Sequence, residues 1–490
     1  MENENKIELK IEITEDIILQ LSQLAAEKNV KIYAVGGFVR DYFLKRKRED
    51  IDITVLGDSI EFAKYVAAHF KSKAVIYERF KTALVPVGKY KLEFVGTRKE
   101  EYVENSRNPI VTDGTFYDDI KRRDFTVNSI AVSLNKDDLG TIVDYFDGLK
   151  DLDAKILKTP LEPETTYSDD PLRMMRAARF AAQLNFEIEK ESLDAISKMK
   201  DRIGIISQER ITEELFKIIA SDNPETGMMI LLDTGLLREI FPELADLKGV
   251  EIVAEENSVY AHKDVLLHSI KVLKNVAAQT DNFWLRFTAL VHDIGKPKSK
   301  RFIEGTGWSF HGHEETGARM MKRIFRRMRL PMDDLAYVEK LIRMHQRPMA
   351  LVDEDITDSA IRRLAANAGA DLEDLFTLVR ADITTKKPNL EEKYKGNYER
   401  VFQKILDVQL RDKLAEFQSP VRGEEIMEIC NIAPCRAVGV IKHNIEEAIL
   451  DGFIPNEYEP AKVYFLANKE LWMSEIQTAT PDWIKPAHLK

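Results

Sequence analysis

Two aspartates, Asp50 and Asp52, carry the side chains in this sequence that are best suited to metal-assisted chemistry. They alternate with an apolar residue, as on a half-buried strand, and because strand side chains repeat every two residues, both carboxylates should face the same way. Two adjacent carboxylates can hold Mg²⁺, which prefers hard oxygen ligands and shares them with substrate phosphates. Upstream, Gly36 and Gly37 would let the backbone approach a triphosphate, and Arg40 can form paired hydrogen bonds to phosphate oxygens. The spacing predicts a nucleotidyl-transfer site, although each feature alone is common on solvated strand ends.

A second polar segment, KRRDFTVNSI at residues 121–130, carries groups that suit a nucleotide. Arg123 could neutralise triphosphate charge, and Asp124 could orient it or shape the sugar pocket. Asn128 offers both a donor and an acceptor to a ribose hydroxyl. Glu93, in the apolar segment LEFV, could add a third carboxylate beside the metals. The alternatives are a basic turn followed by a strand and, for Glu93, an exposed strand residue.

A third segment, DDPLRMMRAARF at residues 169–180, has the pattern of a helix start. Asp169 suits the N-cap and Pro171 suits the first turn. The polar residues that follow recur at every third position and form one slowly drifting stripe: Asp170, Arg173, Arg176 and Arg179. Such a stripe is either a binding surface or a solvated row of arginines.

Histidines gather in one part of the chain, because six of the nine lie between residues 262 and 345. The segment LVHDIGK places an imidazole next to a carboxylate, at His292 and Asp293. Such a pair can bind or bridge a divalent metal, which lowers the pKa of bound water and so produces a nucleophile. A lone histidine on an apolar helix is usually a core or surface residue. The prediction of a metal site therefore depends on the whole group of histidines.

These side chains need a scaffold. Helical periodicity is found over residues 15–29 and 59–70, and alternation predicts strands at 31–35, 51–55, 74–77, 83–87 and 92–95. The segments predict a small mixed α/β sheet domain that ends near residue 155. From Asp170 onward helical periodicity dominates. Breaks are expected near residues 161–164, 249–258 and 386–395.

Length and composition favour a soluble cytoplasmic protein of several domains. The 490 residues suit three or four domains, and the sequence contains no apolar run long enough to span a membrane. The polar N-terminus does not resemble a signal peptide, and two cysteines, Cys430 and Cys435, make a disulfide framework unexpected. The net charge of −11 argues against a nonspecific nucleic-acid coat protein but leaves room for local basic patches. Such clusters occur at residues 45–48, 121–123, 296–301 and 319–329.

The first three motifs together resemble nucleotidyltransferases of the polymerase-β superfamily, and within it the bacterial class II CCA-adding tRNA nucleotidyltransferase and poly(A) polymerase family. RRDFTVN closely matches the family's RRDFT-[IV]-N motif, and DDPLR matches [ED]-D-x-x-R with Asp169 in place of the commoner Glu. The resemblance implies that Asp50 and Asp52 are catalytic and bind Mg²⁺. It also implies that Asp170 and Arg173 act as a protein template, which pairs with the Watson–Crick edge of CTP or ATP. The remaining nucleotide-binding residues that it implies are Gly37, Arg40, Arg123, Asp124, Asn128, Arg176 and Arg179.

The reaction implied is attack by a tRNA 3′-hydroxyl on the α-phosphate of CTP or ATP, with release of pyrophosphate. The segment at residues 98–102 resembles a loop motif of the family, and the loop at 104–117 favours complete CCA addition. The SQERI segment resembles a motif that supports the template helix, with Glu209 and Arg210 paired to neighbours. Poly(A) polymerase and enzymes that add only CC or only A stay open as alternatives. A phosphohydrolase with an inactive transferase head is a further one.

The histidine-rich part resembles the HD phosphohydrolase superfamily through LVHDIGK, FHGHEETG, RMHQRP and RADI. The resemblance implies a divalent transition metal. The core ligand set of the superfamily would be His268, His292, Asp293 and Asp382. His313 and His345 match the extra ligands of members that bind two metals. Lys296 could contact phosphate, and the role of His311 stays open. The activity implied is that of a 2′,3′-cyclic phosphodiesterase or phosphatase, and the alternative is a purely structural domain.

The predicted fold class is α+β, with a mixed-sheet nucleotidyltransferase head followed by an all-α neck, HD domain and tail. The expected boundaries are 1–155 for the head, 156–255 for the neck, 256–390 for the HD domain and 391–490 for the tail. Residues 421–456 of the tail either contact tRNA or form a packing helical cap. The partners expected are tRNA, CTP and ATP, with neither DNA nor a membrane.

Overall fold

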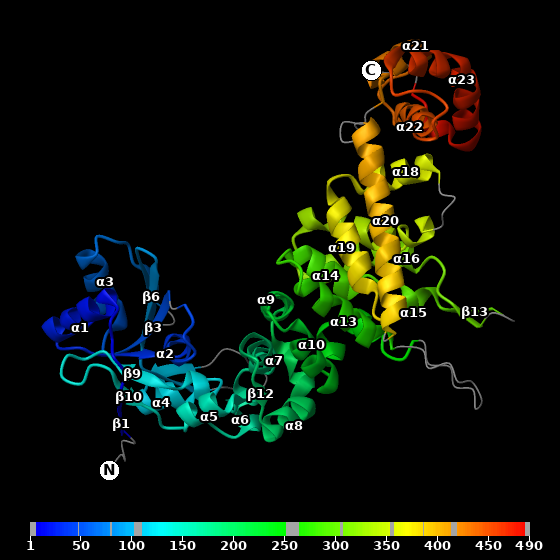
Figure 1. Cartoon of the computed structure of the whole chain (residues 1–490). Coiled ribbons are helices and arrows are strands. Elements are labelled where there is room, and N and C mark those ends of the chain that lie inside the picture. Colours follow the sequence, from blue (N-terminus) through cyan, green and yellow to red (C-terminus); the bar gives the residue numbers. More distant parts are fainter. Residues whose placement is uncertain are drawn as a thin grey trace. The chain divides into compact units, whose positions relative to one another are not determined.

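The structure is a computed structural model of the whole chain (Figure 1). It describes residues 6–47, 49–78, 81–101, 110–250, 264–303, 307–352, 357–385, 387–412 and 419–485. Two compact units are present: Met1–Lys248 with Arg326–Leu330, and Gly249–Phe325 with Pro331–Lys490. None of the helices in the described ranges combines the length and the apolar character that crossing a membrane requires.

An eight-stranded mixed sheet forms the N-terminal part of the first unit, in the order β1-β10-β9-β2-β3-β6-β5-β4. The strands are β1 (Lys6–Lys10), β2 (Lys31–Val35), β3 (Asp50–Leu56), β4 (Val75–Tyr77), β5 (Thr82–Val87), β6 (Tyr90–Gly96), β9 (Ala131–Ser133) and β10 (Thr141–Val143). All five predicted strands are present close to their predicted bounds. The three strands at the β1 edge were not predicted. Two of them, β9 and β10, are short and fully buried, so they show no alternation.

Strand β3 lies in the middle of this sheet, antiparallel to β2 and parallel to β6. Ile51, Ile53 and Val55 are fully buried, whereas Asp50 is exposed and Asp52 is half-buried. The alternation therefore sends the two carboxylates to the face opposite these apolar side chains, as the strand period requires.

Five helices accompany the sheet, with α1 and α3 in contact with each other (Figure 1). They are α1 (Asp16–Lys28), α2 (Gly37–Phe43), α3 (Ser59–His69), α4 (Phe116–Lys121) and α5 (Gly148–Ala154). Asp58 caps α3 by accepting hydrogen bonds from the backbone N–H of Ile60 and Glu61. Strands β7 (Arg98–Glu101) and β8 (Ile110–Asp113) form a separate pair, and residues 104–109 of the predicted loop 104–117 lie outside the described residues.

Helices continue from residue 163 in the same unit: α6 (Pro163–Asp169), α7 (Leu172–Leu184), α8 (Lys190–Met199), α9 (Gln208–Ile219), α10 (Pro224–Asp233), α11 (Leu236–Ile240) and α12 (Pro242–Ala245). The expectation that Asp169 caps the arginine-bearing helix is wrong, because Asp169 ends α6. The N-cap position of α7 falls on Pro171, and Asp170 is the C-cap of α6. Its Oδ1 accepts from the backbone N–H of Leu172, the first residue of α7, at 3.1 Å. A two-residue parallel strand pair, β11 (Ile156–Leu157) with β12 (Glu187–Ile188), interrupts the all-helical pattern.

In its described residues, the second unit is helical apart from the hairpin of β13 (Arg301–Ile303) and β14 (Gly307–Ser309). Its helices are α13 (Val265–Ala277), α14 (Phe283–Val291), α15 (Lys296–Ser299), α16 (His313–Met328), α17 (Leu335–Met344), α18 (Asp358–Ala368), α19 (Leu372–Asp382), α20 (Pro388–Asp412), α21 (Gly423–Cys430), α22 (Arg436–Leu450) and α23 (Tyr458–Ala479). The last residues of α16 belong to the first unit.

Helix α20 differs from the expectation for residues 386–395, which were predicted to form a break. Pro388 begins a 25-residue helix there, because the first helical position tolerates a residue without a backbone N–H. The predicted boundary at 390 falls inside this helix, and the four-part division of the chain stays a prediction. The α+β fold class itself is confirmed.

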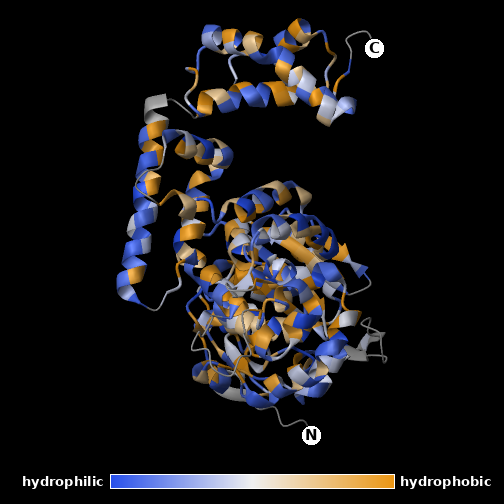
Figure 2. Ribbon diagram, turned by 90° about the vertical axis from the view of Figure 1, so that its right-hand side faces the viewer, coloured by the Kyte–Doolittle hydropathy of each residue, from blue (hydrophilic) through white to orange (hydrophobic). Residues whose placement is uncertain are grey.

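The tail helices α21 to α23 have a core of their own. Ile441, Ile445 and Phe465 are fully buried in it, together with apolar side chains from the segment after α23. Figure 2 shows apolar and polar residues alternating along these helices near the C label. Cys430 and Cys435 are half-buried and free.

Candidate active site and candidate metal centre

Three carboxylates share one face of the sheet at strands β3 and β6. Asp52 is the register partner of Glu93 in the parallel pair, and Asp50 precedes Asp52 by one strand period. Burial raises the pKa of Asp52, Arg123 opposes that rise and Asp50 adds to it. Burial likewise raises the pKa of Glu93, and the charge of Asp52 contributes. Carboxylates that repel one another at a half-buried site are suited to a divalent cation, so this donor set fits Mg²⁺.

Gly36 brings the backbone against this face. Its φ is +71°, and a Cβ placed on it would lie 3.0 Å from Arg123 Nη1 and 3.3 Å from Asp52 Oδ2. Both the left-handed conformation and the close approach therefore require glycine. Gly37, which the sequence nominated, begins α2 and has ordinary space around it. The glycine pair marked this close approach of the backbone in the sequence, but only the first of the two, Gly36, has a conformation that requires glycine.

A buried polar network joins α2, the segment 124–128 and helix α7. Arg40 Nη1 donates to Asn128 Oδ1 at 2.8 Å, and Asn128 Nδ2 donates to Asp124 Oδ1 at 2.9 Å. Arg176 Nε donates to Asp124 Oδ2 at 2.8 Å. Burial alone would raise the pKa of Asp124, but Arg176 and Asn128 outweigh it and hold that pKa well below its usual range. The network fixes α7 against the sheet domain, and it uses the Asn128 amide that was assigned to a ribose.

Phe180 lies at the centre of three guanidinium groups, which approach its ring at 5.1 Å (Arg40), 5.3 Å (Arg176) and 4.1 Å (Arg179). Cations over an aromatic face are attracted by its quadrupole. Arg179 Nη1 also pairs with Glu214 Oε1 of α9 at 3.1 Å. The predicted arginine stripe is therefore not a solvated row, because Arg173 and Arg179 are both buried.

The proposed template residues have protein partners in the structure. Arg173 donates from Nη1 to the Thr166 carbonyl at 3.2 Å and from Nη2 to the Arg122 carbonyl at 2.5 Å. Asp170 Oδ2 lies 3.3 Å from Arg210 Nη2. This contact is the pairing that the SQERI motif predicted, and Glu209 has a partner too, Arg329 at 3.7 Å.

Asp119 is a residue that sequence reasoning missed. It is fully buried, accepts from Thr54 Oγ1 of β3 at 3.1 Å and pairs with Arg122 at 2.6 Å and Arg123 at 3.6 Å. Burial would raise its pKa, but the two arginines lower it. Asp119 thus holds Arg123 toward the acidic face of the sheet. Its position three and four residues before two arginines on a helix was the available signal.

Glu214, also missed, supports a stability prediction. We expect Glu214→Ala to destabilise the first unit by about 3–5 kcal/mol, because it leaves the buried Arg179 without its anion. Glu213→Ala is the matched control on the same helix, since its pair with Lys217 is exposed and should contribute about 0–1 kcal/mol. Urea unfolding of both variants measures the difference. Equal urea midpoints for the two variants would show that the buried pair of Arg179 and Glu214 does not stabilise the first unit.

The second unit gathers the predicted histidines and aspartates from five elements. His268 Nε2 lies 2.8 Å from Asp382 Oδ1, and His313 Nε2 lies 3.1 Å from Asp293 Oδ1. Two groups have three ligand atoms within 4.8 Å of one another: His268, His292 and Asp382; and His292, Asp293 and His345. Within the described part of the chain, only this centre shows such groups.

Three histidines of this centre, His292, His313 and His345, bond through Nδ1 to a backbone carbonyl, which leaves Nε2 toward the cluster. The Nδ1 partners are the carbonyl of Ala289 for His292 at 2.8 Å, that of Phe310 for His313 at 2.9 Å and that of Ile342 for His345 at 2.7 Å. A carbonyl can only accept, so in these three histidines Nδ1 carries the proton and Nε2 is the atom available to a metal ion.

The electrostatics of the centre also suit a divalent metal. Burial would lower the pKa of His292, but the charges of Asp293 and Asp382 raise it to about 10. Its buried Nε2 lies 3.3 Å from Asp293 Oδ2 and 3.5 Å from Asp382 Oδ1, without hydrogen-bond geometry to either. A divalent cation would replace the proton that these two carboxylates hold there. Burial and the charge of His292 lower the pKa of His345 to about 4, so that ligand is neutral at pH 7.

The two other residues considered for this centre differ in position. Lys296 Nζ lies 2.9 Å from Asp293 Oδ2, so it reaches the centre where a phosphate would bind. His311 is exposed on the turn before α16, away from the cluster. Of the two histidines in FHGHEETG, only His313 therefore lies in the cluster.

An acidic strand pair faced by an arginine, followed by an arginine-bearing helix, defines a nucleotidyltransferase, and comparison with known proteins agrees. Three family models match: "Poly A polymerase head domain" at residues 32–158, "Probable RNA and SrmB- binding site of polymerase A" at 185–248, and "HD domain" at 265–368. The "Multifunctional CCA protein" of Shewanella frigidimarina is 32% identical over 312 residues, which are 62% of this chain and 70% of that protein. The chain belongs to the tRNA nucleotidyltransferases, an enzyme family whose members generally use divalent metals.

Other similar proteins differ in how much they cover. The A-adding tRNA nucleotidyltransferase of Aquifex aeolicus is 30% identical over 285 residues, 56% of this chain, but the chain spans only 32% of that relative. Among solved structures, the apo form I of a CCA-adding enzyme has a TM-score of 0.62 at 21% identity and covers 93% of both chains. A tRNA nucleotidyltransferase complexed with a primer tRNA and an incoming ATP analog has a TM-score of 0.58 at 22% identity, covering 80% of this chain and 99% of the other. These structures share the fold.

Proposed function

We propose that this protein completes or repairs the 3′-CCA end of tRNA from CTP and ATP. The observation that carries the proposal is the acidic face of Asp50, Asp52 and Glu93, with Arg123 held against it by Asp119. Relatives named for CCA addition and for A addition support the same reaction class. A solved relative complexed with tRNA and an ATP analog supports tRNA and ATP as partners. CTP is inferred from the template pair.

The residues have separable tasks in this reaction. Asp50 and Asp52 would hold Mg²⁺, which when bound polarises phosphate oxygens and favours ionisation of the attacking hydroxyl. Arg123 would neutralise the triphosphate as the 3′-hydroxyl attacks the α-phosphate and pyrophosphate leaves. Asp170 and Arg173 would exchange their protein partners for a base edge, where the carboxylate accepts from the exocyclic amine of C or A.

The convergent histidines favour a second function in the other unit. We propose that His268, His292, Asp293 and Asp382, with His313 and His345, hold a divalent transition metal for phosphoester hydrolysis. Such a metal, when bound, lowers the pKa of water. The water oxygen adds to phosphorus and the ester P–O bond breaks, with Lys296 placed to neutralise the phosphate. The proposed substrates are 2′,3′-cyclic phosphates or phosphomonoesters at RNA ends.

Extension of defined transcripts tests the first function. tRNA transcripts that end before CCA are incubated with Mg²⁺ and CTP, ATP or both, and sized at nucleotide resolution. The expected result is CC with CTP alone and CCA with both nucleotides. A stop at CC with both would indicate a CC-adding enzyme, and extension only of CC-ended transcripts by one A would indicate the A-adding activity that some relatives carry in their names. A long A ladder would indicate poly(A) polymerase, and no extension would contradict the transferase assignment.

A further inference from the structure

One row of register partners across the sheet joins the acidic face to an apolar surface. Glu93, Asp52 and Val35 are partners on β6, β3 and β2, and the row continues through Ala131 on β9 to Val143 on β10. Register partners on neighbouring strands point to the same face of a sheet. Three strand spacings of about 4.8 Å place Val143 roughly 14 Å from Asp52. The row therefore begins at the metal-binding carboxylates and ends in apolar side chains on their own face.

Helix α4 covers the apolar part of this row and brings aromatic rings to it. Tyr33 and Thr54 are register partners, and Thr54 follows Asp52 by one strand period, so the Tyr33 ring shares the face of the carboxylates. Phe116 of α4 stacks on Tyr33 with 4.3 Å between the ring centroids. Ile120 of the same helix is fully buried against the apolar residues of the row. The rings of α4 therefore lie on the active-site side of the sheet.

Tyr117, the neighbour of Phe116 on α4, is the exposed part of this aromatic cluster, with 42% of its surface accessible. Its ring is stacked on that of Phe146, with 5.8 Å between centroids and 26° between planes. Tyr145 meets it edge-on at 5.2 Å. Both partners follow β10 directly after the end of the register row. Because two rings hold the Tyr117 ring in place, it forms a preorganised stacking surface.

A cation accompanies the exposed ring. Lys121 Nζ lies 5.4 Å from the centroid of the Tyr117 ring, and it pairs with Asp118 Oδ1 at 2.7 Å while one third of its side chain stays exposed. Proteins that bind single-stranded RNA combine these two features, because bases stack on aromatic rings and phosphates pair with cations. The basic cluster at residues 121–123 thus has two parts: Arg122 and Arg123 pair with a buried aspartate, and Lys121 lies beside the aromatic surface.

The two ends of α4 are suited to different substrates. The carbonyl of Arg122, the C-cap of α4, accepts from Arg173 Nη2 of the template helix at 2.5 Å. The incoming nucleotide that is proposed to pair with Arg173 therefore belongs at this end. Tyr117 precedes Arg122 by five residues, roughly 7.5 Å along the helix axis. This leaves the Tyr117 end to the second substrate, the RNA whose 3′-hydroxyl attacks.

We propose that Tyr117 and Phe146 hold the single-stranded 3′ end of the RNA substrate, with one base stacked on Tyr117 and a phosphate paired with Lys121. The proposal rests on the transferase function proposed above and adds the residues that position its second substrate. They act by positioning the strand, whereas bond formation stays with Asp50, Asp52 and the bound metal.

Binding of two matched transcripts tests this surface. One tRNA transcript ends in unpaired CC, and the other lacks the whole single-stranded 3′ end. Tyr117→Ala should weaken binding of the CC-ended transcript roughly 5- to 150-fold, the equivalent of about 1–3 kcal/mol per stacked base, and leave the affinity for the truncated transcript unchanged. In extension assays the KM for RNA should rise by the same factor, whereas kcat and the KM for ATP should not change, because stacking is equal in the ground and transition states.

Two control variants separate stacking from other effects. Tyr117→Phe keeps the ring and should retain the parent affinity for both transcripts. Tyr77→Ala removes a tyrosine that is 50% exposed on β4, at the edge of the sheet away from β10, and should change neither affinity. Equal binding of the CC-ended transcript by the parent and Tyr117→Ala would overturn the proposal. An equal loss for both transcripts would overturn it too.

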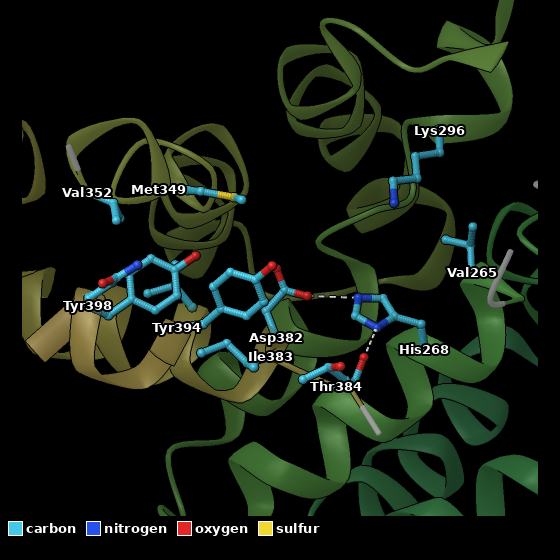
Figure 3. Close-up of a pocket in the computed structure, with 13 residues that line it drawn as sticks. Val265, His268, Lys296, Met349, Val352, Asp382, Ile383, Thr384, Tyr394 and Tyr398 are labelled. Atoms are coloured by element: carbon cyan, nitrogen blue, oxygen red, sulfur yellow. Dashed lines mark hydrogen bonds and ion pairs between the residues drawn. The ribbon is translucent and has the colours of Figure 1, made fainter. Parts of the chain in front are cut away.

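Photocross-linking tests the parent chain without any substitution. A CC-ended transcript with 4-thiouridine in the position before CC is irradiated in the complex, and labelled peptides are mapped by mass spectrometry. We expect label in the peptides that contain Tyr117 or Phe146. Tyr394 lines the cavity beside His268 in the other unit (Figure 3). Label only in the peptide that contains Tyr394 would place the RNA end there and overturn the proposal.

The outcomes for the surface and for the transferase function are separate. Extension by the parent, with no effect of Tyr117→Ala on RNA binding, would overturn the surface and leave the transferase function intact. Weaker binding of the CC-ended transcript by Tyr117→Ala, with no extension by the parent, would support the surface and contradict the transferase function.

Discussion

Replacing Asp52 by Asn should lower nucleotide incorporation by about 1,000-fold or more. Asp52 lies in the middle of the acidic face, opposite Glu93 and 3.3 Å from the position that a Gly36 Cβ would take. Loss of a metal-binding carboxylate removes several kcal/mol of transition-state stabilisation, and each 1.36 kcal/mol is a factor of ten in rate. Single-turnover incorporation of CMP into a transcript that lacks CCA measures the effect.

The same variant should be as stable as the parent or more stable, which distinguishes a functional residue from a structural one. Burial makes the pKa of the Asp52 carboxyl higher in the native state than in the unfolded state. As the pH rises, the unfolded state therefore loses this proton first, and the native state holds it more tightly. Ionisation at neutral pH therefore opposes folding, and Asn removes that cost. Asp137→Asn, on an exposed turn of the same unit, should change neither quantity. A large fall in melting temperature for Asp52→Asn, or full activity, would contradict the assignment.

Replacing Asp293 by Asn should abolish retention of transition metal by the second unit and lower its affinity at least ~100-fold. Asp293 is 98% buried and contacts His292, His313 and Lys296, so it supplies the central anion of the cluster. Its pKa is lowered well below the usual range: burial opposes this, and His292 outweighs burial. Dialysis against Ni²⁺ or Mn²⁺ followed by elemental analysis measures retention.

Asp333→Asn is the control for this experiment, because Asp333 is exposed on a short turn before α17. Hydrolysis of 2′,3′-cyclic phosphates should fall with metal content, whereas CCA addition should persist, since its residues lie in the other unit. Undiminished metal in Asp293→Asn would show that the cluster is structural. Loss of transferase activity as well would show that the variant is misfolded, so melting temperature is measured alongside.

Local patterns predicted a large part of the fold. The strand over 51–55 and the helix over 59–70 follow from periodicity and from the cap at Asp58, which depend on neighbouring residues alone. Periodicity failed where burial was complete on both faces, as in β9, and where a proline began a helix rather than ending one, as at Pro388. The cap predicted at Asp169 was wrong, because α6 continues through Asp169 and the N-cap position of α7 falls on Pro171.

The sequence by itself determined which residue types suited to chemistry stand close together in the chain, because the spacing of Asp50 with Asp52 and of His292 with Asp293 is local. For Asp50 and Asp52, the strand period also sets which way the side chains point. Only the tertiary structure decided how distant groups combine. It joins Arg40 to Asp124 through Asn128, it places Asp119 behind Arg123, and it brings Tyr394 to the cavity beside His268. The physical reason is that such contacts depend on the packing of whole elements and on the exclusion of water between them, and neither is encoded in any short segment.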